Sequence, residues 1–363
     1  MLGTVISVQA NYYWVQLETE MPQSGSGNAG GLFDQPSVLL CTRRSRLKKI
    51  GQQVWVGDRV WVEEPDGDGQ RGAIAEVLPR KTALDRPPVA NASHILLVFA
   101  IADPMLDPMQ LSRFLVKAES TGLAVTLCLN KTDLVALEEQ TAWRDRLRQW
   151  GYDPLFISLA RGEGLGPVSD RLRGHSTIIS GPSGVGKSSL INQLIPSVEQ
   201  RVSAVSGKLG RGRHTTRHVE LFSLPGSGLV ADTPGFNQPD LTCTPSEVGR
   251  YFPEIRQRLG DHACQFSNCL HREEPNCAVR GKWERYEHYL TLLVDAIAYQ
   301  DEQEQRSVKE SAIKVKSGEE GSDRVEPKLA PKRYRQTSRR RQTQNLQEFR
   351  GDVQELLAQE PQD

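Results

Sequence analysis

The chain has 363 residues, and its 45 lysine and arginine residues balance 45 aspartate and glutamate residues, so the formal net charge is zero. This length suggests two or three domains, and a hydrophobic fraction of 37% excludes a wholly disordered chain. No run of about 18 apolar residues is present, which argues against a transmembrane helix. The N-terminal residues lack the pattern of a signal peptide, so we expect a cytoplasmic protein without a membrane partner.

Charge is distributed unevenly along the chain. Cations cluster at residues 43–49, at 200–219 and at 327–347, and none of these three stretches contains an acid. Any one cluster could be a solvated surface loop. Three clusters on a neutral chain favour a polyanion such as RNA, contacted at several places.

Residues 1–82 alternate apolar and polar positions in short stretches, separated by glycine-rich turns, which is typical of β-strands. Five strands are predicted, at residues 3–8, 12–18, 38–41, 59–64 and 72–78. Five strands in this length fit a small barrel of OB type, although the periodicity does not distinguish it from an SH3-like barrel. The basic cluster at 43–49 follows the third strand, where OB domains commonly meet nucleic acid.

Apolar, strand-like stretches then alternate with helical stretches, which predicts a mostly parallel sheet with helices on both faces. The strands are expected at residues 95–101, 124–130, 177–180 and 229–231, and the clearest helices at 109–120, 143–150 and 187–195.

Asn130, Lys131, Thr132 and Asp133 follow the second of these strands and form the pattern N-K-x-D. The pattern is short, but after a buried strand in a phosphate-binding protein it indicates a guanine site. A buried Asp133 carboxylate can accept two hydrogen bonds from guanine, whereas adenine offers no such pair of donors. Lys131 would stack over the base, and Asn130 would tie this loop to the phosphate loop.

A stretch beginning at Ser158 resembles the loop that backs the guanine in GTPases. It has Leu159 where alanine is usual.

The next motif matches G-x-x-x-x-G-K-[ST], with a predicted strand before it and a predicted helix after it. It comprises Gly181, Pro182, Ser183, Gly184, Val185, Gly186, Lys187 and Ser188, and Ser189 follows in the helix. Its backbone amides would cradle the β-phosphate, Lys187 would bridge the β- and γ-phosphates, and the Ser188 hydroxyl would hold Mg²⁺. A glycine-rich turn could match by chance, but the flanking strand and helix argue against that.

Asp232 opens the sequence D-T-P-G directly after a predicted strand. Its carboxylate would hold Mg²⁺ through water, and the amide of Gly235 would sense the γ-phosphate. Thr215 and Thr216 are the candidates for a further Mg²⁺ ligand, and we favour Thr216.

In many GTPases a glutamine after the D-x-x-G motif orients the attacking water, but here that position is Phe236. We therefore predict slow intrinsic hydrolysis. His214 could orient the water, or a partner could supply the missing group. His214 could instead contact RNA phosphate.

The order of the motifs is unusual, because Asn130 precedes Gly181 and no later N-K-x-D exists. A circular permutation explains this order, since the same sheet can begin at a different strand.

Three cysteines and one histidine follow the last nucleotide motif, and they could form a closed tetrahedral site for one structural Zn²⁺. They are Cys264, Cys269, His271 and Cys277. The alternative is a group of buried free cysteines. A helix is expected at 283–298, and a polar, basic tail after 304 reads as disordered, with a short helix at 346–357.

Together these motifs, their order and the Cys/His spacing resemble one family, the bacterial small ribosomal subunit-dependent, circularly permuted GTPases. The resemblance implies an α/β P-loop GTPase domain at 83–244, an N-terminal OB-like barrel at 1–82, a mainly helical zinc-binding domain at 245–303 and a tail at 304–363. It also implies a monomer that hydrolyses GTP to GDP, uses Mg²⁺ and one Zn²⁺, and acts in late maturation of the 30S subunit by binding 16S rRNA.

Two other functions are compatible with parts of the sequence. The chain could be an RNA-binding, GTP-dependent assembly module for another ribonucleoprotein, in which hydrolysis only times release. A metabolic kinase fits less well, because of Asp133 and because no second-substrate site is evident.

Overall fold

The computed structural model describes residues 1–18, 38–63, 71–85, 88–195, 219–232, 241–311, 313–317 and 323–327. These residues form two compact units, one built from residues 1–240 and 251–260, the other from 241–250 and 261–363. Within the described residues, no helix combines the length and the apolar character needed to cross a membrane.

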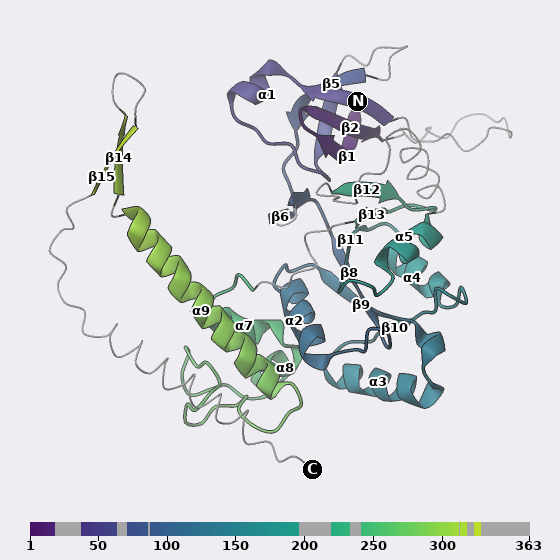
Figure 1. Ribbon diagram of the computed structural model, residues 1–363, viewed down its shortest axis with the longest axis vertical. Coiled ribbons are helices and arrows are strands. Elements are labelled where there is room, and N and C mark those ends of the chain that lie inside the picture. Colours follow the sequence, from purple (N-terminus) through teal and green to yellow (C-terminus); the bar gives the residue numbers. More distant parts are fainter. Residues whose placement is uncertain are drawn as a thin grey trace. The chain divides into compact units, whose positions relative to one another are not determined.

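The first unit begins with a five-stranded barrel, drawn in purple and blue in Figure 1. Its strands are β1 (Leu2–Gln9), β2 (Tyr12–Leu17), β3 (Val38–Arg43), β4 (Arg59–Glu63) and β5 (Arg71–Val77). The strand order is β1-β2-β3-β5-β4, and β4 pairs back with β1 to close the barrel. Only the β3–β5 pair is parallel. The five predicted strands are therefore confirmed, each within two residues at its ends.

Alternation of buried and exposed residues explains this barrel. Val5, Val15 and Val60 are fully buried, whereas their neighbours in sequence face outward where the strand is regular. The helix α1 (Ser45–Lys49) follows β3 and buries only Leu47. Its other residues are exposed and mostly cationic, so the basic cluster lies on the surface of the barrel.

The second part of this unit is a six-stranded segment of sheet in the order β10-β9-β8-β11-β13-β12. Its strands are β8 (His94–Ala100), β9 (Ala124–Asn130), β10 (Leu155–Phe156), β11 (Ser176–Ser180), β12 (Glu220–Ser223) and β13 (Leu229–Asp232). Every neighbouring pair is parallel except β12–β13. The predicted mostly parallel sheet is confirmed.

Helices cover both faces of this sheet. They are α2 (Pro108–Glu119), α3 (Leu137–Gln149), α4 (Leu165–Leu172) and α5 (Lys187–Leu194). A 3-10 turn η1 (Thr132–Leu134) precedes α3, and α8 (Pro253–Asp261) contacts α2 through an ion pair of Arg256 with Glu119. Alternate residues of β8 belong to different cores, Leu97 with residues of α2 and Leu96 with residues of α4 and α5. All seven residues of β8 are buried, as expected for a central parallel strand.

Strand pairing joins the barrel to this sheet, because Ser7 of β1 pairs antiparallel with Glu220 of β12. The connecting segment contains β6 (Ala83–Asp85) and β7 (Pro88–Ala90), which pair with each other. Arg80 of this segment donates two hydrogen bonds, of 2.7 and 2.9 Å, to the fully buried Asp58 carboxylate of the barrel. The barrel is thus joined to the sheet by the β1–β12 pair, and to the connecting segment by the Arg80–Asp58 ion pair.

The second unit is mainly helical. It contains α7 (Pro245–Val248), most of the 3-10 turn η2 (Gly249–Tyr251) and the long helix α9 (Tyr286–Ser311), shown in green in Figure 1. Residues 264–277, which carry the three cysteines and the histidine, form the Cys/His loop between α8 and α9. β14 (Ile313–Ser317) and β15 (Asp323–Pro327) form an antiparallel hairpin after α9.

Part of the tail after residue 304 was predicted to be disordered but has secondary structure. The helix α9 continues past this residue, and the β14–β15 hairpin follows it. Glutamate and glutamine favour helix, and a Gln300–Glu304 hydrogen bond of 3.3 Å links successive turns. The helix predicted at 346–357 lies outside the described residues.

Candidate functional site

The N-K-x-D segment lies where β9 ends, at the carboxyl edge of the parallel sheet. Asn130 is almost fully buried, and its Nδ2 donates a hydrogen bond of 2.8 Å to the backbone oxygen of Val185. Val185 belongs to the glycine loop, residues 181–188, which joins β11 to α5. The expected tie between the two motifs is therefore present, although they are far apart in sequence.

Asp133 lies in η1, beside the loop that begins at Ser158. The Ser158 hydroxyl donates a hydrogen bond of 2.5 Å to the Asp133 carboxylate. Ser158 is fully buried, and its oxygen also accepts from the amide of Arg161 at 3.2 Å. The hydrogen bond from Ser158 is the main reason that the pKa of Asp133 is lowered, so the carboxylate is ionised at neutral pH.

Lys131 adopts a left-handed conformation with φ 64°, which turns its side chain toward the loop after β8. Its ammonium donates to the backbone oxygen of Asp103 and lies 3.7 Å from the Asp103 carboxylate. No sequence pattern marks this contact, because Asp103 belongs to no motif.

Two glycines of the glycine loop have conformations that other residues adopt only with strain. Gly181 has φ 144°, and a Cβ there would lie 1.9 Å from the backbone oxygen of Val98. Gly186 has φ 100°, and a Cβ would lie 2.4 Å from Nδ2 of Asn130. The glycines thus allow the loop to approach β8 on one side and the N-K-x-D segment on the other.

The helix α5 begins at Lys187, so its free amides face the glycine loop. The Lys187 ammonium donates to the backbone oxygens of Gly181 and Pro182, at 2.9 and 2.5 Å. Gly184 also has a left-handed φ of 80°. The loop, the lysine and the helix terminus together form a positively polarised group that is suited to an anion.

For the predicted nucleotide-site residues that follow α5, the structure describes either the backbone alone or nothing. The backbone of Asp232 ends β13, next to Ile179 of β11 and so beside the glycine loop. His214, Thr215, Thr216, Gly235 and Phe236 lie outside the described residues.

The predicted metal ligands come together in the second unit. One ligand atom from each of Cys264, Cys269, His271 and Cys277 lies within 4.8 Å of all the others. The sulfurs of Cys264 and Cys277 are 3.9 Å apart, and each is 3.5 Å from Nδ1 of His271. Tetrahedral zinc with thiolates at about 2.3 Å gives ligand separations of about 3.8 Å, so these residues fit the ion.

Side chains outside the Cys/His pattern hold the backbone around His271. The Glu274 carboxylate accepts hydrogen bonds from the amides of Leu270 and Arg272, at 2.8 and 2.7 Å. From α9, the Tyr286 hydroxyl donates to the backbone oxygen of His271 at 2.8 Å. The Tyr289 hydroxyl donates to that of Leu270 at 2.6 Å. Sequence reasoning missed these three residues, because their role depends on where α9 packs.

Burial also sets the protonation of the cluster. It raises the pKa of the Cys269 thiol to about 12 and lowers the pKa of His271. A neutral imidazole is the form that binds a metal, and the Cys269 thiol would ionise when a cation binds beside it.

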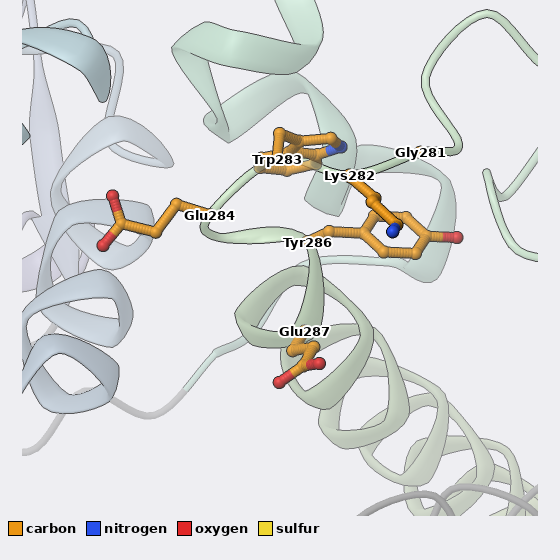
Figure 2. Close-up of a pocket in the computed structure, with 6 residues that line it drawn as sticks. All are labelled: Gly281, Lys282, Trp283, Glu284, Tyr286 and Glu287. Atoms are coloured by element: carbon orange, nitrogen blue, oxygen red, sulfur yellow. The ribbon is translucent and has the colours of Figure 1, made fainter.

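A surface pocket of about 420 Å³ lies where the segment after the cluster enters the first turn of α9 (Figure 2). It is lined by Gly281, Lys282, Trp283, Glu284, Tyr286 and Glu287. The rings of Trp283 and Tyr286 are 5.7 Å apart and lie together in Figure 2, while Glu284 points away from them. None of the residues that the sequence predicts for nucleotide or metal binding lines this pocket.

Comparisons with known proteins agree with the geometry. The sequence model of the RsgA GTPase family matches residues 77–242. A protein of Trichormus variabilis named "Small ribosomal subunit biogenesis GTPase RsgA" is 61% identical over 96% of each chain. A Synechocystis protein of the same name is 52% identical over 96% of this chain and 94% of its own.

Two solved structures are also similar. The crystal structure of YjeQ from Thermotoga maritima covers 82% of this chain and 98% of its own, with 29% identity and a TM-score of 0.66. That of YloQ, described as a circularly permuted GTPase, covers 83% and 95%, with 30% identity and a TM-score of 0.65. The chain therefore belongs to the RsgA GTPase family.

Proposed function

We propose that this protein is a GTPase of small ribosomal subunit biogenesis, which hydrolyses GTP to GDP and phosphate when it engages the 30S subunit. One observation carries the proposal. Two relatives that are 61% identical to this chain over 96% of both chains bear the name of small ribosomal subunit biogenesis GTPase. We further propose that the protein acts in the cytoplasm as a monomer.

The N-K-x-D segment is the guanine site. Asp133 is held by Ser158 and stays ionised, so its two oxygens can accept the N1–H and the exocyclic amine of guanine. Asn130 couples this segment to the glycine loop through Val185. Thr132 is held in turn, since its hydroxyl donates to the backbone oxygen of Ile157 at 3.0 Å. Asp133 is half-buried rather than buried as expected. A charged acceptor held in this way favours guanine, which offers it two donors, over adenine, which does not.

The glycine loop is the phosphate site. Its backbone amides and the start of α5 would bind the β-phosphate, and Lys187 would exchange its carbonyl partners for phosphate oxygens. Ser188 and Asp232 would hold Mg²⁺, which neutralises charge on the phosphates. Ser183 and Ser189 flank these positions and complete the proposed phosphate site.

Hydrolysis requires a group that orients the attacking water, and Phe236 cannot do so. We propose that His214 or a group of the bound subunit supplies it, and that Thr216 rather than Thr215 completes the Mg²⁺ site. Slow hydrolysis by the free protein follows from this arrangement.

The barrel at 1–82 is proposed to be an OB-type domain that contacts 16S rRNA. Its closed strand order, with β3 and β5 parallel, supports this type of barrel. Arg46, Lys48 and Lys49 are exposed on α1, and Tyr12 and Trp14 of β2 are 52% and 37% exposed. A domain that exposes both cations and aromatic rings is suited to RNA phosphates and bases.

We also propose that residues 83–244 are the GTPase domain, and that residues 245–303 form a domain built on one structural Zn²⁺. Cys264, Cys269, His271 and Cys277 would fill all four positions of a tetrahedral ion, which leaves none for a substrate. The basic tail would add a further contact with RNA.

The test is GTP turnover by the full-length protein with and without purified 30S subunits. We expect slow turnover alone and a large increase with 30S subunits, but no increase with 50S subunits. Turnover that 30S subunits leave unchanged would refute the proposal. Stimulation by a different ribonucleoprotein, and not by 30S subunits, would favour the assembly module for another particle.

A further inference from the structure

Gln193 lies near the end of α5, on the helix that follows the glycine loop, and its side chain is exposed. No motif includes it. Its Nε2 donates a hydrogen bond of 2.8 Å to the backbone oxygen of Leu159. This bond joins α5 to the loop that begins at Ser158.

The loop at Ser158 is the point where the other elements of the site meet. The Leu159 amide donates to Oδ1 of Asn130 at 3.3 Å, and Ser158 holds Asp133. The Leu159 side chain also reaches the glycine loop, since its Cδ1 lies 3.2 Å from where a Cβ of Gly186 would be. Leucine, which replaces the usual alanine here, thus packs against the glycine loop.

Both backbone polar groups of Leu159 are therefore held by side chains from other elements. Asn130 accepts from its amide, and Gln193 donates to its oxygen. Without Gln193, the Leu159 oxygen loses the only protein donor that the described residues provide for it. Ser158, and with it Asp133, would then be positioned less rigidly.

We propose that Gln193 is a positioning residue for guanine recognition, which fixes the Leu159 peptide and through Ser158 the carboxylate of Asp133. The inference rests on the proposed guanine site. It predicts an effect on the base and not on the phosphates, because the backbone hydrogen bonds of α5 and the lysine at its start do not depend on Gln193.

The experiment measures GDP and ADP affinities of the full-length protein by calorimetry. Gln193→Met removes the donor but keeps a straight side chain that favours helix. We expect GDP to bind about 3- to 10-fold more weakly, as for one lost hydrogen bond, and ADP to bind unchanged. Gln193→Lys restores a donor and should recover most of the GDP affinity.

Gln149→Met is the matched control, because it makes the same change at an exposed position at the end of α3. It should leave both affinities unchanged. A wild-type protein that binds GDP and ADP equally would refute the proposed guanine site, and this inference with it. A wild-type preference for GDP that Gln193→Met leaves intact, or that Gln193→Lys fails to recover, would refute the inference alone.

Discussion

The Cys/His cluster and the carboxyl edge of the sheet are both built from loops, but they are held together in different ways. The cluster draws its four ligand side chains from one short segment, 264–277. The edge of the sheet draws its side chains from loops after three different strands, joined by bridges such as Asn130–Val185. A bound ion can organise the first site, whereas the second depends on a sheet that is already folded.

This difference predicts that metal removal affects one unit and not the other. Structural zinc contributes about 10 kcal/mol or more to small domains that depend on it. We expect chelation, or Cys277→Ser, to unfold the segment around the cluster, seen as loss of hydrogen-exchange protection in residues 261–300. GDP affinity should stay near that of the wild type. Protection that survives removal of the metal would show that α9 holds the loop without an ion.

Gly181→Ala should disturb the first unit and leave the Cys/His cluster intact. The added Cβ would lie 1.9 Å from the Val98 oxygen, in a left-handed backbone. We expect the free energy of unfolding of the first unit to fall by about 3 kcal/mol and nucleotide binding to be lost, with zinc content unchanged. Gly166→Ala is the control, since no atom lies near its Cβ position and its φ is ordinary. Normal nucleotide binding by Gly181→Ala would contradict the close approach of the loop to β8.

Another bridge between side chains joins the strands at the opposite edge of the sheet. His94 of β8 is buried and bonds Thr126 of β9 and Thr177 of β11, at 2.9 and 3.1 Å. Burial, followed by the nearby charges of His175 and Arg171, lowers the pKa of His94 to about 4. The folded state therefore favours the neutral imidazole.

The neutral imidazole makes its full contribution to the free energy of unfolding above the ordinary histidine pKa of about 6.5. This contribution is lost as the pH falls toward 4, because the unfolded state then binds a proton that the folded state does not. The difference in pKa corresponds to about 3 kcal/mol for the first unit. Denaturant unfolding at several pH values measures it, and His94→Gln should be less stable at pH 7 but lose less stability on acidification. An equal pH slope in the two proteins would exclude His94 as the source.

The same distinction explains what the sequence could predict. The N-K-x-D segment, the glycine loop and the four metal ligands are local patterns, so their residues could be named and the Asn130 tie expected. The contacts of Gln193 with Leu159 and of Tyr289 with Leu270 depend on packing between elements distant in sequence, and no local pattern marks them. The start of α3 was also missed, because Leu137 in its first turn is 74% exposed and leaves no apolar periodicity there.

The smallest expected effect is that of Glu274 on zinc affinity, which tests whether the ion alone orders the Cys/His loop. Glu274 binds the amides on both sides of His271, which itself has a left-handed φ of 56°. Glu274→Ala should weaken zinc binding about 10- to 100-fold, as is typical for residues that support a metal ligand, when measured by competition with a chromogenic chelator. Glu273→Ala, next to it and exposed, is the control and should not change the affinity. If Glu274→Ala binds zinc as tightly as the wild type, the ion orders this loop without help from its neighbours, and the contrast with the sheet edge becomes sharper.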